Sequence, residues 1–339
     1  MTVLASGRSG RTVEPPAIEV ADLTVRFRLR DRTVHAVNGV SFRLGRGEVL
    51  GILGESGSGK SVTLRALMRL LPANCKIGGQ IAVGGEDVNG ASANRLEDLR
   101  GARIAMIFQE PITALDPVFT IGEQIAETVA RHEGVSRREG RRRALDLLER
   151  VQIPSARRRL DSYPHEMSGG MRQRATIALA LCCNPGVLLA DEPTTALDVT
   201  VQIQILLLLR ELQRELGMAV IFVTHDVGAA VEVSDRLAVM YAGRFVETGS
   251  ARAVMRKHAH PYTEGLLAAN LHGAEPGTRL ITIPGAPPDL AALPPGCSFA
   301  PRCSSALSAC SERMPNLEPC GEGHVARCIR IKGRLAVPA

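Results

Sequence analysis

The chain has 339 residues, enough for one large hydrophobic core or for one core with a smaller appendage. Its hydrophobic content of 45% is ordinary for a folded globular protein, and no apolar run is long enough to span a bilayer. The net charge of +6 comes partly from arginine runs such as 141–143 and 157–159. No aromatic residues alternate with these arginines, which favours a solvated helix face beside an anionic membrane or partner over a nucleic-acid surface.

The first residues lack the apolar core of a secretory signal and are small, polar and proline-containing. We therefore expect a disordered N-terminal tail over 1–16, in a protein that is cytosolic or bound to a membrane only through a partner. Residues 18–48 alternate between apolar and polar side chains, which predicts twisted antiparallel strands. Residues 80–90 predict another short hairpin. The apolar run 49–53 predicts a buried strand that leads into a glycine-rich segment.

This glycine-rich segment has the composition of a phosphate-binding loop. It lies between a predicted strand and a predicted helix over 61–71, which is the context that such a loop needs. Its glycines let successive backbone N–H groups point at one anion, and the helix N-terminus adds unpaired donors. The loop lysine is expected to reach the β- and γ-phosphates, and the serine after it to hold Mg²⁺. The predicted nucleotide-binding residues are Gly54, Glu55, Ser56, Gly57, Ser58, Gly59, Lys60 and Ser61.

The rest of the first 250 residues alternates between helical and extended patterns. From about 112 to 180 the pattern is helical, with charge-rich amphipathic stretches. Apolar runs return at 187–190 and 219–223 between helical segments, as expected of parallel strands buried on both faces. The last predicted strands lie near 236–241 and 244–246.

Polar side chains follow three of the predicted strands. In a phosphate-loop ATPase, Asp191 belongs near Mg²⁺, and Glu192 can polarise the water that attacks the γ-phosphate. His225 follows a strand at the edge where ligands gather, which favours a contact with the γ-phosphate. Gln109 also follows a strand, but by itself it indicates little.

A second candidate anion cradle precedes a long helical run and consists of Ser168, Gly169 and Gly170. The serine hydroxyl can cap free N–H groups at the helix start. By themselves these residues are equally typical of an ordinary capped helix. Two cradles in one chain suggest a nucleotide sandwiched between two copies of the fold.

Together these residues resemble, in order and spacing, the ATP-binding cassette of ABC transporters, over roughly residues 18–335. The motifs that carry the resemblance are the loop at 54–61, Gln109, Ser168-Gly169-Gly170, Asp191-Glu192, Ala196-Leu197-Asp198 and His225. The resemblance implies an α/β phosphate-loop fold with a RecA-like core, an antiparallel β subdomain and a helical subdomain at about 112–180. This ATP-binding domain would occupy residues 17–255.

The resemblance also implies roles for individual residues. Phe27 would stack on adenine, and Glu192 would be the catalytic base, assisted by His225 and Gln109. The implied Mg²⁺ ligands are Ser61, Gln109 and Asp191. Ser168, Gly169 and Gly170 would serve the nucleotide of the opposite subunit, with Asp198 at the dimer seam. Met171 stands where the general signature has Gln, a variant that resembles the oligopeptide/dipeptide importer subgroup.

After Ser250 the composition changes, with many prolines followed by five cysteines within 32 residues. This region looks like the C-terminal extension of peptide-permease ATPases, which implies an extension over 256–339 with a small cysteine-rich domain at 296–329. The residues alone leave an iron–sulfur cluster, zinc and metal-free thiols open, although the close Cys-x-x-Cys pairs typical of structural zinc are missing. The resemblance implies a [4Fe–4S] cluster on Cys297, Cys303, Cys310 and Cys328. Cys320 would then be a spare thiol or an alternative ligand.

We therefore predict the ATP-hydrolysing subunit of an ABC importer for di- or oligopeptides, at the cytoplasmic face of the membrane. The resemblance implies a second, homologous cassette that often differs in sequence, two transmembrane permease subunits and an extracytoplasmic peptide-binding protein. Nickel, glutathione or another small solute is an alternative cargo. A soluble ABC ATPase acting on nucleic acid or ribosomes is a further alternative, but such proteins commonly carry two cassettes in one chain, and this chain has one.

Overall fold

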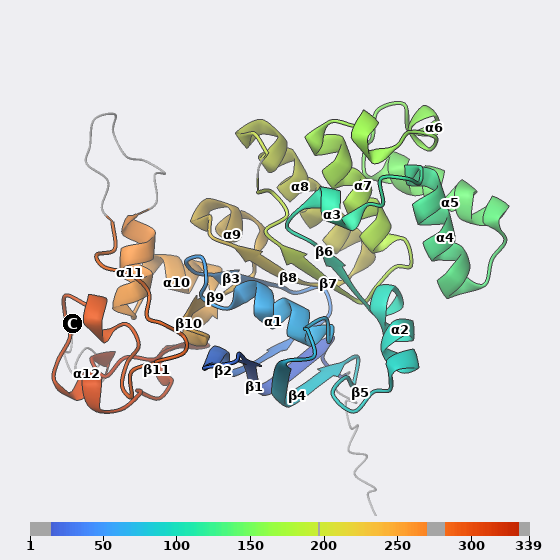
Figure 1. The fold of residues 1–339 in the computed structure, drawn as a ribbon. Coiled ribbons are helices and arrows are strands. Elements are labelled where there is room, and N and C mark those ends of the chain that lie inside the picture. The colour runs from blue at the N-terminus through green and yellow to red at the C-terminus, as the bar shows by residue number, and fades with distance from the viewer. Residues whose placement is uncertain (1–14, 196, 270–281, 332–339) are drawn as a thin grey trace, which may run out of the picture.

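The computed structural model describes residues 15–195, 197–269 and 282–331. The tail expected over 1–16 therefore lies almost entirely outside the described residues, as does Ala196. Two β-sheets form the centre of the molecule, one of four strands and one of eight (Figure 1). Within the described residues, no helix combines the length and apolar character needed to cross a membrane.

The four-stranded sheet is antiparallel and has the order β2-β1-β4-β5. It consists of β1 (Ile18–Arg28), β2 (Thr33–Leu44), β4 (Cys75–Val83) and β5 (Glu86–Asp87). Buried residues alternate with more exposed ones along much of β1, because one face of an antiparallel sheet can cover the core while the other meets water. The antiparallel strands expected at 18–48 and the hairpin at 80–90 are thus confirmed.

The eight-stranded sheet has a parallel centre with the order β9-β3-β8-β7-β6. Its strands are β3 (Val49–Leu53), β6 (Ile104–Ile107), β7 (Val187–Asp191), β8 (Ala219–Thr224) and β9 (Arg236–Tyr241). Nearly every residue in them is buried, because both faces of the sheet are covered. Successive residues therefore enter different cores. Leu188 and Ala190 pack with the helical segment, and Val187 and Leu189 with the antiparallel sheet.

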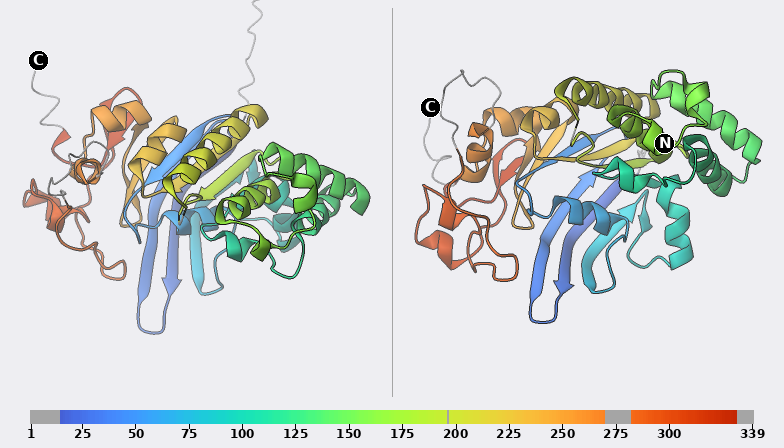
Figure 2. Two further views of the ribbon diagram at one scale, coloured as in Figure 1. Left: turned by 90° about the horizontal axis from the view of Figure 1, so that it is seen from above. Right: turned by 45° about the horizontal axis from the view of Figure 1, so that its top comes forward.

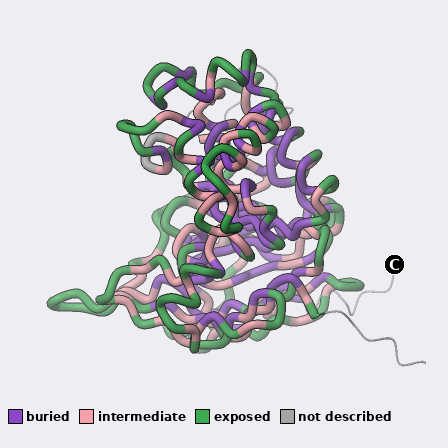
Figure 3. Tube along the Cα trace, turned by 90° about the vertical axis from the view of Figure 1, so that its right-hand side faces the viewer, coloured by how far each residue is buried: buried purple, intermediate pink, exposed green. Residues whose placement is uncertain are grey.

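The helices surround this sheet, and α4 to α7 form a group at one side of it (Figures 1 and 2). The helices are α1 (Lys60–Leu67), α2 (Ala93–Ala102), α3 (Pro111–Ala114), α4 (Ile121–Glu133), α5 (Arg137–Arg150), α6 (Ala156–Arg159), α7 (Gly169–Leu181), α8 (Val199–Leu216) and α9 (Val227–Val233). The buried trace is concentrated in the middle of the molecule, and the outer helices of this group present exposed turns (Figure 3). Arginines of the run 141–143 are exposed or half-buried and form ion pairs with carboxylates, including Asp161, Glu139 and Asp146.

The C-terminal segment continues the central sheet. Beyond β9, the antiparallel strand β10 (Arg244–Ser250) pairs with β12 (His324–Ala326), which pairs in turn with β11 (Glu318–Gly321). The other elements of this segment are α10 (Ala251–Arg256), α11 (Pro261–Ala268), the 3-10 helix η2 (Ala300–Arg302) and α12 (Ala309–Glu312). A separate core that includes Tyr241, Tyr262 and Phe299 joins it to the cassette.

Candidate nucleotide site

The phosphate loop connects β3 to α1, and its glycines are required by close backbone contacts. A Cβ atom at Gly54 would lie 2.3 Å from the carbonyl oxygen of Met240. Gly59 has φ +105°, and a Cβ there would lie 2.5 Å from the carbonyl oxygen of Ala36. Larger residues would displace the loop from the neighbouring strands. The curled conformation predicted from the sequence is therefore fixed by what packs behind it.

Lys60 is buried at the start of α1 and already has partners on the loop. Its Nζ donates hydrogen bonds to the carbonyl oxygens of Gly54 (2.8 Å) and Glu55 (3.0 Å), and lies 3.9 Å from the Glu192 carboxylate. Burial lowers the pKa of Lys60, while the charges of Glu192, Asp191 and Glu55 act to raise it. The ammonium group is therefore held in place among carboxylates, where an anionic phosphate would be a favourable added neighbour.

Ser61 and Asp191, which were each predicted to lie near Mg²⁺, are in direct contact. The Ser61 hydroxyl donates to Asp191 Oδ1 at 2.7 Å. The other oxygen of this fully buried carboxylate, Oδ2, has no hydrogen-bond partner among the described residues. Burial raises the pKa of Asp191, and the Ser61 hydrogen bond opposes that rise. A hydroxyl beside an unsatisfied carboxylate is a donor set that suits Mg²⁺, so these residues fit the metal that a phosphate-loop ATPase uses.

Three side chains converge on one oxygen of Glu192. Its Oε2 accepts from Gln109 Nε2 (3.3 Å) and Thr195 Oγ1 (3.1 Å), and lies 3.1 Å from His225 Nδ1. Glu192 itself has φ +47°, a left-handed conformation that costs a non-glycine residue energy and is often found at functional sites. The sequence predicted Gln109, Glu192 and His225, and the structure brings them together. The sequence analysis did not identify Thr195, because a hydroxyl three residues after the strand-end glutamate is a weak signal.

Apart from Gly54 and Asp191, the site residues described above line one open cavity of about 740 Å³. The cavity lining is Phe27, Val34, Ala36, Glu55, Ser56, Gly57, Gly59, Lys60, Ser61, Val62, Gln109, Glu192, Thr195, His225 and Leu290. Phe27, which the resemblance implies stacks on adenine, is part of this lining. Leu290 was not predicted and comes from the C-terminal segment, where its carbonyl oxygen accepts a hydrogen bond from His35 N–H on β2 (2.9 Å). Gly54 and Ser58 support the loop from behind and are not part of the lining.

The second predicted cradle lies outside this cavity. Ser168 caps α7 by accepting a hydrogen bond from the Met171 N–H (3.3 Å), and Asp198 caps α8 in the same way (3.0 Å). Ser168, Gly169 and Asp198 are exposed. A Cβ at Gly170 would lie 2.9 Å from a methyl group of Val201 on α8, so the two capped helix starts pack together. Within one chain the structure does not bring them to the nucleotide cavity.

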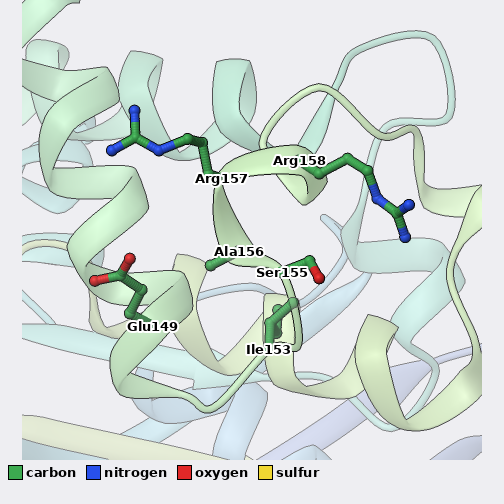
Figure 4. Close-up of a pocket in the computed structure, with 6 residues that line it drawn as sticks. All are labelled: Glu149, Ile153, Ser155, Ala156, Arg157 and Arg158. Atoms are coloured by element: carbon green, nitrogen blue, oxygen red, sulfur yellow. The ribbon is translucent and has the colours of Figure 1, made fainter.

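Another open cavity, of about 700 Å³, lies in the helical group near α6 (Figure 4). Glu149, Ile153, Ser155, Ala156, Arg157 and Arg158 line it. The guanidinium groups of Arg157 and Arg158 point in opposite directions, so they do not form a common anion site. None of these residues lines the nucleotide cavity.

Four of the five C-terminal cysteines line one small cavity, namely Cys297, Cys303, Cys310 and Cys328. Cys320 lies elsewhere and donates from its thiol to the carbonyl oxygen of His324 (3.4 Å). None of the eight cysteines, which all fall in the described ranges, forms a disulfide. The cavity, which other residues of the segment also line, has a volume of about 20 Å³. Among the described residues, no group of three or more His, Cys, Asp or Glu is arranged to hold a metal ion.

The parallel sheet, the phosphate loop and the strand-end carboxylates define a phosphate-loop ATPase of the ABC type. The ABC transporter family model matches residues 37–195, and the model for the oligopeptide/dipeptide transporter C-terminal region matches 246–310. Two proteins of Brucella abortus, named for peptide import and ATP binding, are each 50% identical to the chain. One alignment covers 93% of this chain and 97% of the relative, and the other 92% and 94%.

Solved structures agree with this assignment. The ATP-binding cassette MJ0796, in a dimeric post-hydrolysis state with ADP and Pi, has a TM-score of 0.63 at 29% identity, over 69% of this chain and 99% of that one. The cbiO1 protein of Clostridium perfringens, part of the cbiONQ transporter complex, has a TM-score of 0.61 at 31% identity, over 72% of this chain and 92% of that one. The chain belongs to the ABC transporter family, as an ATP-hydrolysing subunit of its peptide-import branch.

Proposed function

We propose that the chain drives a peptide importer by closing with a second cassette around two molecules of ATP. The convergence of Gln109, Thr195 and His225 on Glu192 Oε2 carries the catalytic part of this proposal. Bound Mg²⁺, held by Ser61, Asp191 and Gln109, would offset the negative charge of the phosphates. Phe27 would stack on the base, and the loop at 54–61 would receive the phosphates.

The chain's own groups supply the remaining chemistry. Glu192, oriented by its three neighbours, would accept a proton from the attacking water. Lys60, already fixed by two loop carbonyls, would hold the β- and γ-phosphates. His225, whose side chain is largely exposed, lies 3.1 Å from Glu192 and would orient its carboxylate, and we propose that it also contacts the terminal phosphate.

A second cassette would complete the site. Ser168, Gly169 and Gly170 form a capped helix start away from the chain's own cavity, with Ser168 and Gly169 exposed and Gly170 half-buried. Their exposure supports a role at the nucleotide of a partner, with Asp198 beside them at the seam. The dimeric structure of the cassette MJ0796 with ADP and Pi supports an assembly of two cassettes. We further propose a homologous but different partner cassette, two permease subunits and an extracytoplasmic peptide-binding protein, with this chain at the cytoplasmic membrane face.

The decisive experiment replaces the proposed base. Glu192→Gln keeps the size and the hydrogen-bonding shape of the side chain but cannot take up a proton. We expect the variant to lose ATP turnover by roughly a hundredfold or more while still binding ATP, and to accumulate as an ATP-bound dimer. Turnover and size-exclusion chromatography with and without ATP measure this. Unchanged turnover would remove Glu192 from its proposed role.

For the C-terminal thiols we propose a bound metal group, with [4Fe–4S] favoured and zinc as the alternative. The grouping of Cys297, Cys303, Cys310 and Cys328, with Cys320 outside the group, supports this set of ligands. These cysteines are not arranged as a metal site in the structure, so binding a cluster would require them to rearrange. The cysteine-rich region at 296–329 would then be a small metal-binding unit of the extension over 256–339.

Metal analysis of the purified full-length chain tests this proposal. We expect iron and acid-labile sulfide with a brown colour, lost in Cys303→Ala and retained in the matched control Cys320→Ala. A colourless protein that contains zinc would instead support the zinc site. The absence of both metals from anaerobically purified protein would contradict the proposal.

A further inference from the structure

One residue of the phosphate loop is held from outside the cassette core. The backbone N–H of Glu55 donates to the hydroxyl oxygen of Tyr262 on α11 at 2.9 Å. Its carboxylate accepts two hydrogen bonds from Arg302 at the end of η2, at 2.7 and 2.9 Å. Both partners belong to the C-terminal segment, 207 and 247 positions further along the chain. Backbone and side chain of the same loop residue are thus fixed by that segment.

The Arg302 side chain is buried and has several hydrogen-bond partners. Its side chain is 5% exposed, and it also donates to the carbonyl oxygen of Pro284 (2.8 Å) and to the hydroxyl of Tyr241 (3.3 Å). Its guanidinium carbon lies 5.8 and 5.9 Å from the ring centroids of Tyr241 and Phe299. The hydrogen bonds from Arg302 to Glu55 raise the pKa of Arg302 above its ordinary value. A buried, bidentate arginine of this kind holds its carboxylate partner in one geometry.

This geometry reaches the nucleotide cavity through the main chain of Glu55. The carbonyl oxygen of Glu55 is one of the two acceptors that hold Lys60 Nζ. Glu55 and Lys60 also both line the cavity. If Glu55 shifts, the backbone donors of the loop and the lysine shift with it. Small displacements of a catalytic site can have large effects on rate and affinity.

We propose that Arg302 and Tyr262 are positioning residues for the ATPase, through which the C-terminal segment keeps the phosphate loop in its nucleotide-accepting shape. This inference rests on the proposed nucleotide site and adds a part of the chain that lies outside the ABC cassette match. The C-terminal segment would then affect ATP binding by positioning Glu55 of the phosphate loop. The competing explanation is a purely mechanical attachment, in which the same contacts only hold the segment on the cassette.

The test measures ATP affinity in variants confirmed to be folded. We expect Arg302→Gln to weaken binding of a fluorescent ATP analogue by roughly tenfold or more at a temperature where circular dichroism shows the full-length protein to be folded. Arg302→Lys keeps the charge but loses the bidentate geometry, so its ATP affinity should lie between those of Arg302→Gln and the parent. Arg313→Gln, at an exposed arginine of the same segment, is the matched control and should bind as the parent does.

Two further variants separate positioning from attachment. Tyr262→Phe removes the acceptor for the Glu55 N–H without a charge change and should also weaken ATP binding. The double variant Glu55→Gln/Arg302→Gln should bind ATP no more weakly than Arg302→Gln alone, because the two groups act as one unit. A mechanical attachment would lower the melting temperature of all these variants but leave their ATP affinity within twofold of the parent, which would overturn the inference. Failure of the parent itself to bind ATP would instead contradict the proposed nucleotide site.

Discussion

At the scale of single residues, the site is organised around Glu192. The sequence could predict this residue because an apolar strand followed by two carboxylates is a pattern visible in one short stretch. His225 was predictable because it ends another strand of the same parallel sheet, whereas Gln109, which also follows a strand, was predicted only through the resemblance to the family. Thr195 was not, because a hydroxyl in a loop forms no pattern and its role appears only through its 3.1 Å hydrogen bond to Glu192.

Removing the Thr195 hydroxyl should slow hydrolysis without weakening ATP binding. Thr195→Val keeps the shape of the side chain but loses the donor that orients Glu192. We expect kcat to fall roughly three- to tenfold, the effect of one hydrogen bond of about 1 kcal/mol, with little change in KM. Steady-state kinetics measure both constants. Thr195→Ser restores the hydroxyl and should restore most of the rate, and a valine variant with parental kcat would show that the contact has no catalytic effect.

At the scale of elements, the strands of both sheets were largely predictable, and β11 and β12 were not. The central strands are continuous apolar runs, and β1 and β2 alternate, so each carries its own signal. β11 and β12 are four and three residues long, and β11 contains a proline and a glycine. They form because β10 offers a free edge, and that edge is not visible in their own sequence.

A buried carboxylate secures this added edge. Glu247 on β10 is fully buried, accepts hydrogen bonds from the N–H groups of Ala259 and His260, and lies 2.7 Å from His324 Nε2 on β12. Burial alone would raise its pKa, but the hydrogen bonds from His324 and these backbone groups outweigh it, and the pKa is lowered below 4.5. As the pH falls, Glu247 therefore becomes protonated in the unfolded chain at a higher pH than in the folded protein. The stability that ionised Glu247 contributes is present above pH 4.5 and is lost below it.

Glu247→Gln should therefore destabilise the protein at neutral pH more than at acid pH. We expect the free energy of unfolding to fall by about 3 kcal/mol at pH 7, since a buried pair loses one partner, and the difference from the parent to narrow below pH 4.5. Urea unfolding at both pH values measures it. Glu322→Gln, at an exposed glutamate between β11 and β12, is the control and should stay close to the parent. A constant difference at all pH values would contradict the assigned titration.

At the scale of the whole molecule, the sequence predicted the class of protein and the two anion cradles, but not how the C-terminal segment meets the loop. Motifs such as 54–61 consist of neighbouring residues, so the motifs and their spacing along the chain were sufficient to predict the class of protein. The contact between Arg302 and Glu55 joins positions 247 apart, and no local pattern links them. The location of Ser168 outside the chain's own cavity is likewise visible only in three dimensions.

A shared site makes activity depend on concentration. We expect the specific ATPase activity of the isolated chain to rise steeply as protein concentration increases or as its partner cassette is added, because each half-site needs a second chain. Ser168→Arg should bind ATP as the parent does but show no such rise. Activity assays across a hundredfold dilution series, with sedimentation to follow association, provide the measurement. Constant specific activity in strictly monomeric protein would contradict the shared site.

The short segment from Cys297 to Cys303 contacts two sites. Its two thiols line the cysteine cavity, and its Arg302 binds Glu55 of the phosphate loop. Thermodynamic linkage makes any coupling between two such places reciprocal. If a ligand in the thiol cavity alters ATP affinity, ATP must alter the affinity of that cavity for the same ligand by the same free energy. The energy state of the cell and the state of these cysteines would then be sensed by one turn of seven residues.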